Sequence, residues 1–592
     1  MAPTHAECNQ LVALFNAGHY AELESLTRFL LERCPDSGFA WKTLGVTLQL
    51  QGKDSLLALQ KATELLPNDA EVHSNLGITL HDAGRLGEAE ARYRRALQIK
   101  PDYAEAYSNL GLTLQDAGRL DEAAASYRRA LQIKPNIAVT HFNLGNVLKD
   151  IGQLDDAVAN FRKALELKPD YVEAFNNLLF AYNLLPNQPP SWMLAEARRY
   201  GKLVAQQARP YTNWSNVPEP DRCLRIGLVS GDLRNHAVGY LVESVLPALA
   251  SNASGRLELI AYSNHSCTDA LTERIKACCC GWHSVVRFSD EALARQISDD
   301  GIDILLDLSG HTAYNRLPVF AWKPAPVQAS WLGYFATTGV AAMDYLIADP
   351  WSVPETEEAH FTEKIWRLPE TYLCSSPPDV GEQVAPLPAL TVGYITFGCF
   401  NNLTKMNNDV VALWAQVLRA VPESRLFLKT KQLDDVTVRQ DVVNRFAAHG
   451  IAAGRLIIEG AAPRAELLAA YHRVDIALDP FPYTGGTISR EALWMGVPVL
   501  TLAGDRFLSH IGEVNLQNAG LPEWIAASPD DYVAKAAEYA ADLERLAALR
   551  ANLRQQVLAS PVFDAPRFAR HFEVALRGMW TQWCAQQQGK PL

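Results

Sequence analysis

Three short segments of the sequence combine residue types that could carry out a group transfer. In the first, Asp232 and His236 lie four residues apart, directly after an apolar run. A carboxylate and an imidazole at this spacing suit a general base, or a base and the group that orients it. The alternative is an aspartate that caps a loop and a histidine with a structural role, and the segment alone favours that alternative.

The second segment ends in Lys405 and also contains Asn402. A lysine that faces a cleft can neutralise the charge of a leaving diphosphate. Taken alone, a solvated lysine is the simpler interpretation of Lys405.

The third segment begins at Asp479 and is the most specific of the three. Gly485 and Gly486 have no side chain, so the backbone there can approach a ligand closely. We expect Thr487 to cap a helix whose free amides hold a diphosphate. Glu491, one turn further on the same face, could bind both ribose hydroxyls. The alternative is an ordinary strand-to-helix turn.

The elements around these segments place all three at the carboxyl ends of parallel strands, where ligands bind in such sheets. Buried strands are expected at 224–230, 257–262, 302–308, 394–397, 425–429, 455–459, 476–479 and 499–502, with helices between them, such as 290–298 and 488–495. This alternation predicts doubly wound parallel sheets. A proline-rich stretch divides the region into two Rossmann-like halves, 222–388 and 389–592, the arrangement called GT-B. A last helix over 566–582 is expected to cross back onto the first half.

A repeat of 34 residues occupies the region before these halves. It is seen at Asn75, Asn109, Asn143 and Asn177, at Gly77, Gly111 and Gly145, at Ala89, Ala123 and Ala157, at Tyr93, Tyr127 and Phe161, and at Pro101, Pro135 and Pro169. Period and residue types match the tetratricopeptide pattern. Small residues fit where two helices touch, a ring fills the gap between them, and proline ends the second helix. Degenerate copies are expected at 13–34 and 41–67. The sequence therefore predicts a helical solenoid over 1–185, followed by a connecting helix and linker over 186–221.

Stacked helical repeats form a concave surface that can bind a protein or peptide. Asn75, Asn109, Asn143 and Asn177 recur on the first helix of each unit, where their amides could hold the backbone of an acceptor. The alternative for the asparagines is an internal hydrogen-bond ladder. The alternative for the repeats is a role in folding or in a homodimer.

Composition excludes several classes of protein. With 592 residues the chain is too long for one core, and its net charge of −12 argues against a nucleic-acid binder. We expect no signal peptide, because no basic start precedes an apolar run, and no membrane span, because no run of about 18 apolar residues occurs. Cys278, Cys279 and Cys280 are adjacent, which is poor spacing for zinc ligands. No Asp-X-Asp loop is found, so we expect no metal. The 10 cysteines do not indicate a disulfide framework, so the expected compartment is the cytoplasm.

At these segments the sequence resembles glycosyltransferase family 41, which contains the O-linked N-acetylglucosamine transferases and the SPINDLY-type O-fucosyltransferases. The resemblance covers nearly the whole chain, with further blocks at 310–312, 323–328, 331–334, 337–340, 343–345 and 494–498. It implies an α-helical tetratricopeptide superhelix followed by an α/β GT-B fold of two Rossmann-like domains.

The resemblance also implies roles for individual residues. Asp232 and His236 match the pair beside the acceptor hydroxyl and the sugar, and Lys405 matches the lysine that stabilises the departing diphosphate. The residues expected to contact the donor are Asn402, Arg464, Gly485, Gly486, Thr487, Glu491, Thr338 and Gly339.

Two departures from the family bear on the donor. Residues 486–488 stand where the N-acetylglucosamine enzymes have His-Thr-Thr, and no histidine near Trp192 matches one that they carry before the catalytic region. UDP-N-acetylglucosamine is the first expectation, GDP-fucose the second and UDP-glucose the third, as a co-substrate with no other cofactor. The expected activity is inverting, metal-independent transfer to serine or threonine of intracellular proteins that the repeats bind. Rival interpretations are a scaffold with a vestigial transferase domain, and a transferase for small molecules or glycans.

Overall fold

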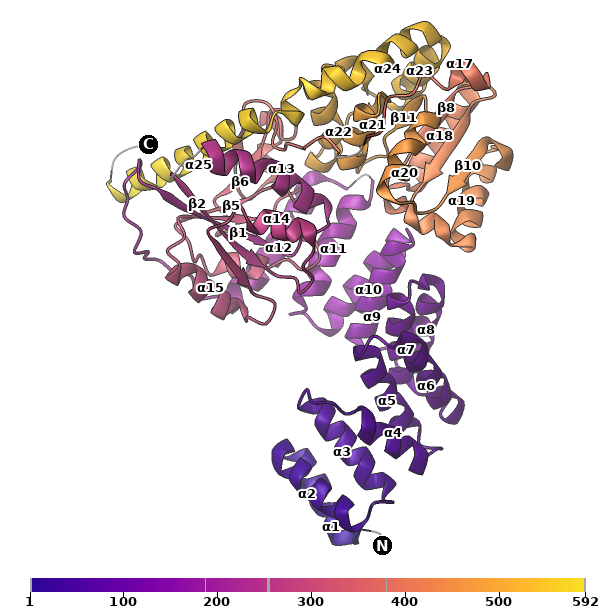
Figure 1. The fold of residues 1–592 in the computed structure, drawn as a ribbon, viewed down its shortest axis with the longest axis vertical. Helices are drawn as coiled ribbons and strands as arrows, with labels where there is room; N and C mark the ends of the chain where they lie inside the picture. The colour runs from indigo at the N-terminus through magenta and orange to yellow at the C-terminus, as the bar shows by residue number, and fades with distance from the viewer. Residues whose placement is uncertain (1–2, 187, 253–255, 379–380, 590–592) are drawn as a thin grey trace. The chain divides into compact units, whose positions relative to one another are not determined.

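A computed structural model of the chain describes residues 3–186, 188–252, 256–378 and 381–589 (Figure 1). The chain divides into two compact units, Met1–Ala174 and Phe175–Leu592. The first is helical and the second contains two parallel sheets. The fold class expected from the sequence is thereby confirmed.

The helices of the first unit pack in consecutive pairs. They are α1 (His5–Asn16), α2 (Tyr20–Arg33), α3 (Gly38–Leu50), α4 (Leu56–Leu65), α5 (Ala70–Asp82), α6 (Leu86–Ile99), α7 (Ala104–Asp116), α8 (Leu120–Ile133), α9 (Ala138–Asp150) and α10 (Leu154–Leu167). The degenerate pair at the start begins at His5, eight residues earlier than the expected position 13. The remaining pairs follow the predicted repeat.

Close contact between the two helices of a pair explains the repeated glycine and ring. A Cβ atom added at Gly111 would lie 2.7 Å from a ring carbon of Tyr127, and one at Gly145 would lie 2.6 Å from a ring carbon of Phe161. Both rings are fully buried. The expectation that a small residue and a ring meet between the helices is confirmed. A larger residue at either glycine would push the pair apart.

The first sheet of the second unit is built, within the described residues, from seven parallel strands in the order β3-β2-β1-β4-β5-β6-β7. Its strands are β1 (Leu224–Ser230), β2 (Leu257–Ser263), β3 (Gly281–Ser284), β4 (Ile304–Asp307), β5 (Val327–Ser330), β6 (Tyr345–Ala348) and β7 (Lys364–Arg367). The accompanying helices are α11 (Val172–Leu184), α12 (Pro190–Gln207), α13 (Ala237–Asn252), α14 (Ala270–Lys276), α15 (Asp290–Asp299), α16 (Leu317–Ala321) and the 3-10 helix η1 (Glu355–His360). We call this part the first sheet domain.

The second sheet has six parallel strands in the described ranges, in the order β10-β9-β8-β11-β12-β13. They are β8 (Thr396–Cys399), β9 (Arg425–Lys429), β10 (Leu456–Glu459), β11 (Ile476–Leu478), β12 (Val499–Leu502) and β13 (Ile525–Ala526). The helices are α17 (Ala389–Val392), α18 (Asn408–Ala420), α19 (Val436–Ala448), α20 (Arg464–Ala469), α21 (Thr487–Trp494), α22 (Phe507–Asn518), α23 (Pro529–Ala541) and α24 (Leu543–Leu558), with the 3-10 helices η2 (Leu403–Lys405) and η3 (Lys431–Asp434). We call this part the second sheet domain.

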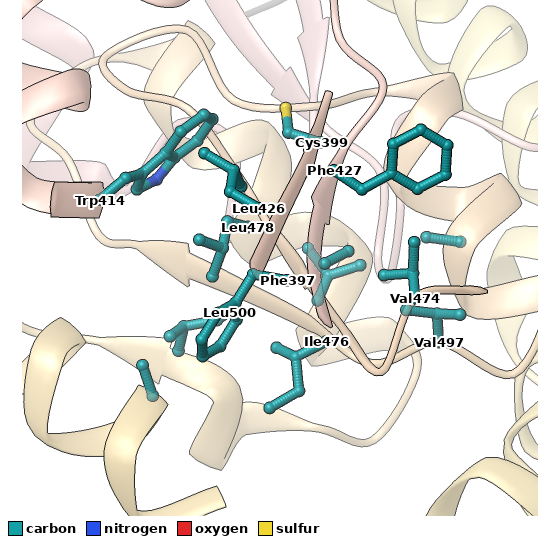
Figure 2. Close-up of a cluster of buried hydrophobic side chains, with 14 of the residues drawn as sticks. Phe397, Cys399, Trp414, Leu426, Phe427, Val474, Ile476, Leu478, Val497 and Leu500 are labelled. Carbon is teal, nitrogen blue, oxygen red and sulfur yellow. The ribbon is translucent and has the colours of Figure 1, made fainter. Parts of the chain in front are cut away.

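The core of the second sheet domain is formed by apolar side chains of its central strands. Figure 2 shows Phe397, Ile476 and Leu500 from three adjacent strands, with Trp414 of α18 beside them. All four are nearly or fully buried. This packing fixes β8 beside β11, and therefore fixes the loops that follow these two strands beside each other.

The last helix, α25 (Ala565–Gln587), follows the second sheet in sequence but packs against α13 and β5 of the first sheet domain (Figure 1). The Phe572 ring lies with its centroid 4.4 Å from that of Trp331, which follows β5. The chain thus returns to the first sheet domain, as the sequence predicted for its last helix.

Buried polar contacts attach α11 and α12 to the first sheet domain. The fully buried His311 ring hydrogen-bonds Asn176 of α11 at 2.6 Å and the Thr338 carbonyl at 3.0 Å. Burial lowers the pKa of His311 to about 3, so this ring is neutral and structural. Asn183 of α11 donates to the Tyr334 hydroxyl at 2.6 Å. The second compact unit therefore begins inside α11, ahead of the connecting helix.

Candidate active site

Lys405 lies at the end of η2, in the loop that follows β8, and reaches the loop that follows β11. Its Nζ atom donates to the Thr484 carbonyl at 2.8 Å and to Asn401 Oδ1 at 3.3 Å. It also lies 3.7 Å from the centroid of the Tyr483 ring. Among the described residues these two acceptors use two of the three ammonium protons, which leaves one for a ligand.

The charge of Lys405 is tuned by its surroundings. Burial lowers the pKa of Lys405 to about 8, and the carboxylate of Asp479 opposes that effect. Burial raises the pKa of Asp479 to about 6. Near neutral pH the lysine is protonated. Because burial disfavours its charge, an anionic ligand beside it would stabilise the charged form.

Asp479 holds the glycine turn against the start of α21. Its Oδ1 atom accepts from Gly485 N at 3.1 Å and from the Ser489 hydroxyl at 2.7 Å. A Cβ atom at Gly485 would lie 1.9 Å from Ser489 Oγ, so only glycine fits there. A Cβ atom at Gly486 would meet its nearest heavy atom at 3.9 Å. Gly485 is thus required by the protein itself, whereas the described residues leave room for a Cβ atom at Gly486.

The expected capping role of Thr487 is wrong by one residue. Thr487 is the first residue of α21 and Gly486 occupies the cap position, without a side-chain cap. Because Gly486 supplies the last non-helical backbone, with φ −93° and ψ −97°, the helix begins earlier than predicted. The Thr487 hydroxyl instead accepts a hydrogen bond from Arg490 at 3.2 Å.

Glu491 is buried one turn into α21 and is paired with Arg464. Glu491 Oε1 lies 2.8 Å from Arg464 Nη2, while the buried Oε2 atom has no hydrogen-bond partner among the described residues. Burial raises the pKa of Glu491, and Arg464 opposes this. Arg464 also lies over the Tyr240 ring of α13, 5.6 Å from its centroid. Arg464 therefore joins Glu491 to the first sheet domain.

The other predicted donor contacts lie in two different environments. Asn402 is exposed, and its Oδ1 atom accepts from Thr404 N at 2.9 Å and from Gln432 Nε2 at 2.8 Å. Thr338 is buried, its amide donates to Glu363 at 2.7 Å, and its hydroxyl hydrogen-bonds the same carboxylate. A Cβ atom at Gly339 would lie 2.0 Å from the carbonyl oxygen of Ala197 in α12. The structure gives Thr338 and Gly339 a packing role, and a donor contact at these two residues stays a prediction.

Asp232 and His236 lie in the loop between β1 and α13. Asp232 is 4 % exposed, and its Oδ1 atom is 3.6 Å from His236 Nδ1. Burial raises the pKa of Asp232 and partial burial lowers that of His236. The Val238 amide donates to His236 Nδ1 at 3.3 Å. A neutral ring whose Nδ1 accepts this bond carries its proton on Nε2, so His236 presents an N–H group to a substrate.

The four repeated asparagines occupy the same place on α5, α7, α9 and α11, and each is half-buried. The side chain of Asn143 hydrogen-bonds Tyr127 of the preceding repeat. At this position the structure contains the internal contact that the sequence left open as an alternative. Asn177 lies in the second compact unit.

A buried histidine that the sequence did not single out joins the two sheet domains. His510 of α22 lies with Nδ1 2.6 Å from Glu513 and with Nε2 3.0 Å from Glu357 of η1. Hydrogen bonds to the two carboxylates raise the pKa of His510 to about 9, against the effect of burial. No local pattern could reveal this contact, because Glu357 and His510 are 153 residues apart.

Tyr483 is a second residue that sequence reasoning missed. Its ring supports the ammonium of Lys405 and lies 5.9 Å, centroid to centroid, from the Phe335 ring of the first sheet domain. The signal in the sequence that could have identified Tyr483 is its position two residues before the glycine pair.

Within the ranges that the structure describes, no three His, Cys, Asp or Glu side chains gather as ligands of a metal would. Cys278, Cys279 and Cys280 follow α14 as free thiols. In the same ranges no helix combines the length and the apolar character needed to span a bilayer.

The sequence matches models of known protein families. The family model described as Glycosyl transferase family 41 matches residues 199–379 and 386–572, and the tetratricopeptide repeat model matches 68–136 and 102–170.

Curated relatives include plant proteins named "Probable UDP-N-acetylglucosamine--peptide N-acetylglucosaminyltransferase SPINDLY". The one from Hordeum vulgare is 36% identical over 424 residues, which cover 70% of this chain and 44% of that protein. The one from Arabidopsis thaliana is 36% identical over 421 residues, covering 70% and 46%. The chain thus spans about half the length of the curated relatives it matches.

A solved structure of a mutant Thermobaculum terrenum O-GlcNAc transferase is similar over most of both chains. It superposes with a TM-score of 0.80 at 37% sequence identity, and the match covers 88% of this chain and 98% of that one.

Proposed function

Because this chain belongs to glycosyltransferase family 41, we propose that it transfers a sugar from a nucleotide sugar to serine or threonine hydroxyls of proteins. The observation that carries the proposal is the environment of Lys405, a lysine at the carboxyl edge of the second sheet with one proton that no described residue accepts. Ligands bind at that edge in parallel sheets, and a fixed cation there stabilises a departing diphosphate. The printed names of the relatives, which describe peptide N-acetylglucosaminyltransferases, support a protein acceptor.

The reaction is an inverting, single displacement at the anomeric carbon. The acceptor oxygen forms its bond to that carbon as the bond to the diphosphate oxygen breaks. Lys405 and the amides at the start of α21 take up the charge of the nucleoside diphosphate. Alignment of the two reactants, with a stabilised leaving group, removes the need for a covalent intermediate.

Asp232 and His236 have different roles toward the acceptor: one accepts a proton and the other donates a hydrogen bond. His236 uses Nε2–H to hold an oxygen of the acceptor or sugar, because its Nδ1 atom is engaged by the Val238 amide. Asp232 accepts the proton of the hydroxyl, since burial raises its pKa and makes it a better base.

UDP-N-acetylglucosamine is the first donor to test and GDP-fucose the second, with UDP-glucose third. The observation that favours GDP-fucose is the run Gly486, Thr487 and Ile488 in place of His-Thr-Thr, together with a glutamate at Glu491. Both donors present a ribose to Glu491 and a diphosphate to Lys405, so the same residues serve either one.

The test is hydrolysis and peptide transfer with a panel of these nucleotide sugars, with Lys405→Ala as the control. Lys405-dependent turnover of UDP-N-acetylglucosamine is the expected result, and turnover of GDP-fucose alone would select the alternative donor. Tight nucleotide binding without turnover of any donor, with or without acceptor peptides, would contradict the proposal and favour a scaffold.

The pKa of Lys405 sets an alkaline limit on activity. Below pH of about 8 the free enzyme carries a protonated Lys405, and above it the lysine becomes neutral. Because kcat/KM reports the free enzyme, it should fall as pH rises through about 8, by roughly tenfold for each further pH unit. Lys405→Arg, whose guanidinium stays protonated, should lose this alkaline limb at whatever lower activity it retains. A wild-type profile without the limb would show that Lys405 does not titrate in this range.

A further inference from the structure

The rings of two residues, Tyr314 and His265, contact each other beside the loop that contains Asp232. Their ring centroids are 4.6 Å apart and the ring planes meet at 80°. His265 follows β2 and Tyr314 follows β4, and β1 pairs with both of these strands. The loop after β1 therefore lies between the two segments that supply the rings. We call Tyr314 and His265 the aromatic bridge.

The backbone of Tyr314 is held in a conformation that tyrosine disfavours. Its φ is 58°, in the left-handed region. Asn264 donates from its side chain to the Tyr314 carbonyl at 2.9 Å and from its backbone to the Ser230 carbonyl at 2.8 Å. A Cβ atom at Gly231 would lie 2.4 Å from Tyr314 Cβ, so the close crossing requires glycine. Strain that the surroundings maintain in this way is typical of functional positions.

Packing does not explain why the ring of Tyr314 is placed there. The residue is 55 % exposed, and its backbone lies beside Gly231 and Asn264, the residues that directly follow β1 and β2. Tyr314 is also adjacent to Gly231, the residue before Asp232. A large ring fixed in water, beside a candidate base, is placed to contact something that binds to that base.

The bridge offers two ring faces that stand nearly at right angles to each other and have little charge around them. Burial, together with the nearby Arg234, lowers the pKa of His265, so this ring is neutral at neutral pH. The charged groups that face it are Arg234 and Asp232, whose side chains lie 3.8 Å apart and offset each other. Neutral aromatic faces bind proline rings and other flat apolar groups of extended chains.

The position of the bridge separates it from the expected place of the donor. Lys405 and Glu491, which would hold the diphosphate and the ribose, come from the second sheet domain. The bridge belongs to the first sheet domain and adjoins Asp232, the group that would accept the proton of the hydroxyl. We therefore expect the bridge to contact the acceptor polypeptide, which carries the hydroxyl that is modified.

We propose that Tyr314 and His265 form a subsite for the acceptor polypeptide, which takes a proline or a similar flat apolar residue next to the modified serine or threonine. The proposal rests on the proposed function and deepens it, because it names the kind of acceptor segment that the site selects. An extended segment fits, since it can lay one residue on the bridge while the neighbouring hydroxyl reaches Asp232.

The test is direct binding of two synthetic peptides to the full chain in the presence of UDP or GDP. One peptide has proline on both sides of a central serine, and its twin has glycine at those two positions. We expect the proline peptide to bind roughly three- to tenfold more tightly to the wild type. Tyr314→Phe should keep this preference. Tyr314→Asn should lose it, because asparagine tolerates positive φ but has no ring.

Trp351→Asn is the matched control, because Trp351 is a 44 % exposed ring that follows β6, two strands from β4. It should keep the preference. Equal binding of the two peptides to the wild type, no binding of either, or a preference that survives in Tyr314→Asn would each overturn the proposal. So would a rise in KM for the nucleotide sugar in Tyr314→Asn with peptide affinity unaltered, which would assign the bridge to the donor. Lys405-dependent hydrolysis of a donor, measured in parallel, shows whether the proposed function stands when the bridge fails.

Discussion

Replacing Lys405 with alanine is expected to lower kcat for sugar transfer by about 100- to 1000-fold, the usual effect of removing one fixed charge-stabilising donor. The lysine contacts the Thr484 carbonyl and Asn401, so its third proton is the one that a diphosphate oxygen would meet. Because charge on that oxygen grows as the bond to the sugar breaks, the loss should appear mainly in kcat. Steady-state kinetics of hydrolysis and of peptide transfer measure it.

Folding of the Lys405→Ala protein should be nearly unchanged. Lys405 is half-buried, and the Asp479 carboxyl that would lose its partner can take up a proton, since its pKa is about 6. Lys431→Ala is the matched control, because Lys431 is exposed at the start of η3 in the same domain. Thermal unfolding of the three proteins checks stability. Wild-type turnover in Lys405→Ala would remove this lysine from the mechanism.

Replacing His236 with alanine should lower kcat by about 100-fold while the KM for the nucleotide sugar changes little. His236 belongs to the first sheet domain, whereas the groups expected to hold the nucleotide come from the second. Its ring is neutral and carries the proton on Nε2, so what alanine removes is a hydrogen-bond donor.

A glutamine at this position separates donation from proton transfer. The amide of His236→Gln can replace the Nε2–H group but cannot act as a base, so this variant should recover part of the activity that alanine loses. If glutamine is as inactive as alanine, His236 is the base and Asp232 is its orienting partner. His449→Ala, at the end of α19, is the control and should behave as the wild type.

The candidate site shows which kinds of contact local sequence can predict. Asp232, His236, Lys405 and Gly485 were singled out as candidates because each lies in a segment that follows an expected strand, and the carboxyl ends of parallel strands share one edge of a sheet. Glu491 was placed by helical spacing from Thr487. These inferences need only the positions of strands and helices, which the apolar pattern of the chain carries locally.

Other features were predicted wrongly or were missed, because they depend on neighbours that are distant in sequence. Thr487 was assigned to the cap, but the backbone of Gly486 takes that place under the constraint of Asp479 and Ser489. The packing of Gly339 against Ala197 crosses from one helix to a loop more than a hundred residues later.

The sequence by itself determined the repeats of 34 residues, most of the longer strands, and the division into helical and α/β regions, because periodic burial of apolar side chains is decided within each element. The short strands, such as β13, carry too few residues for a period to be seen. Only the tertiary structure decided which loops meet. The orders β2-β1-β4 and β8-β11 bring His265 to Tyr314 and Lys405 to Thr484. The physical reason is that the order of strands in a sheet follows from how whole helices and strands pack together, and no local stretch of sequence contains that packing.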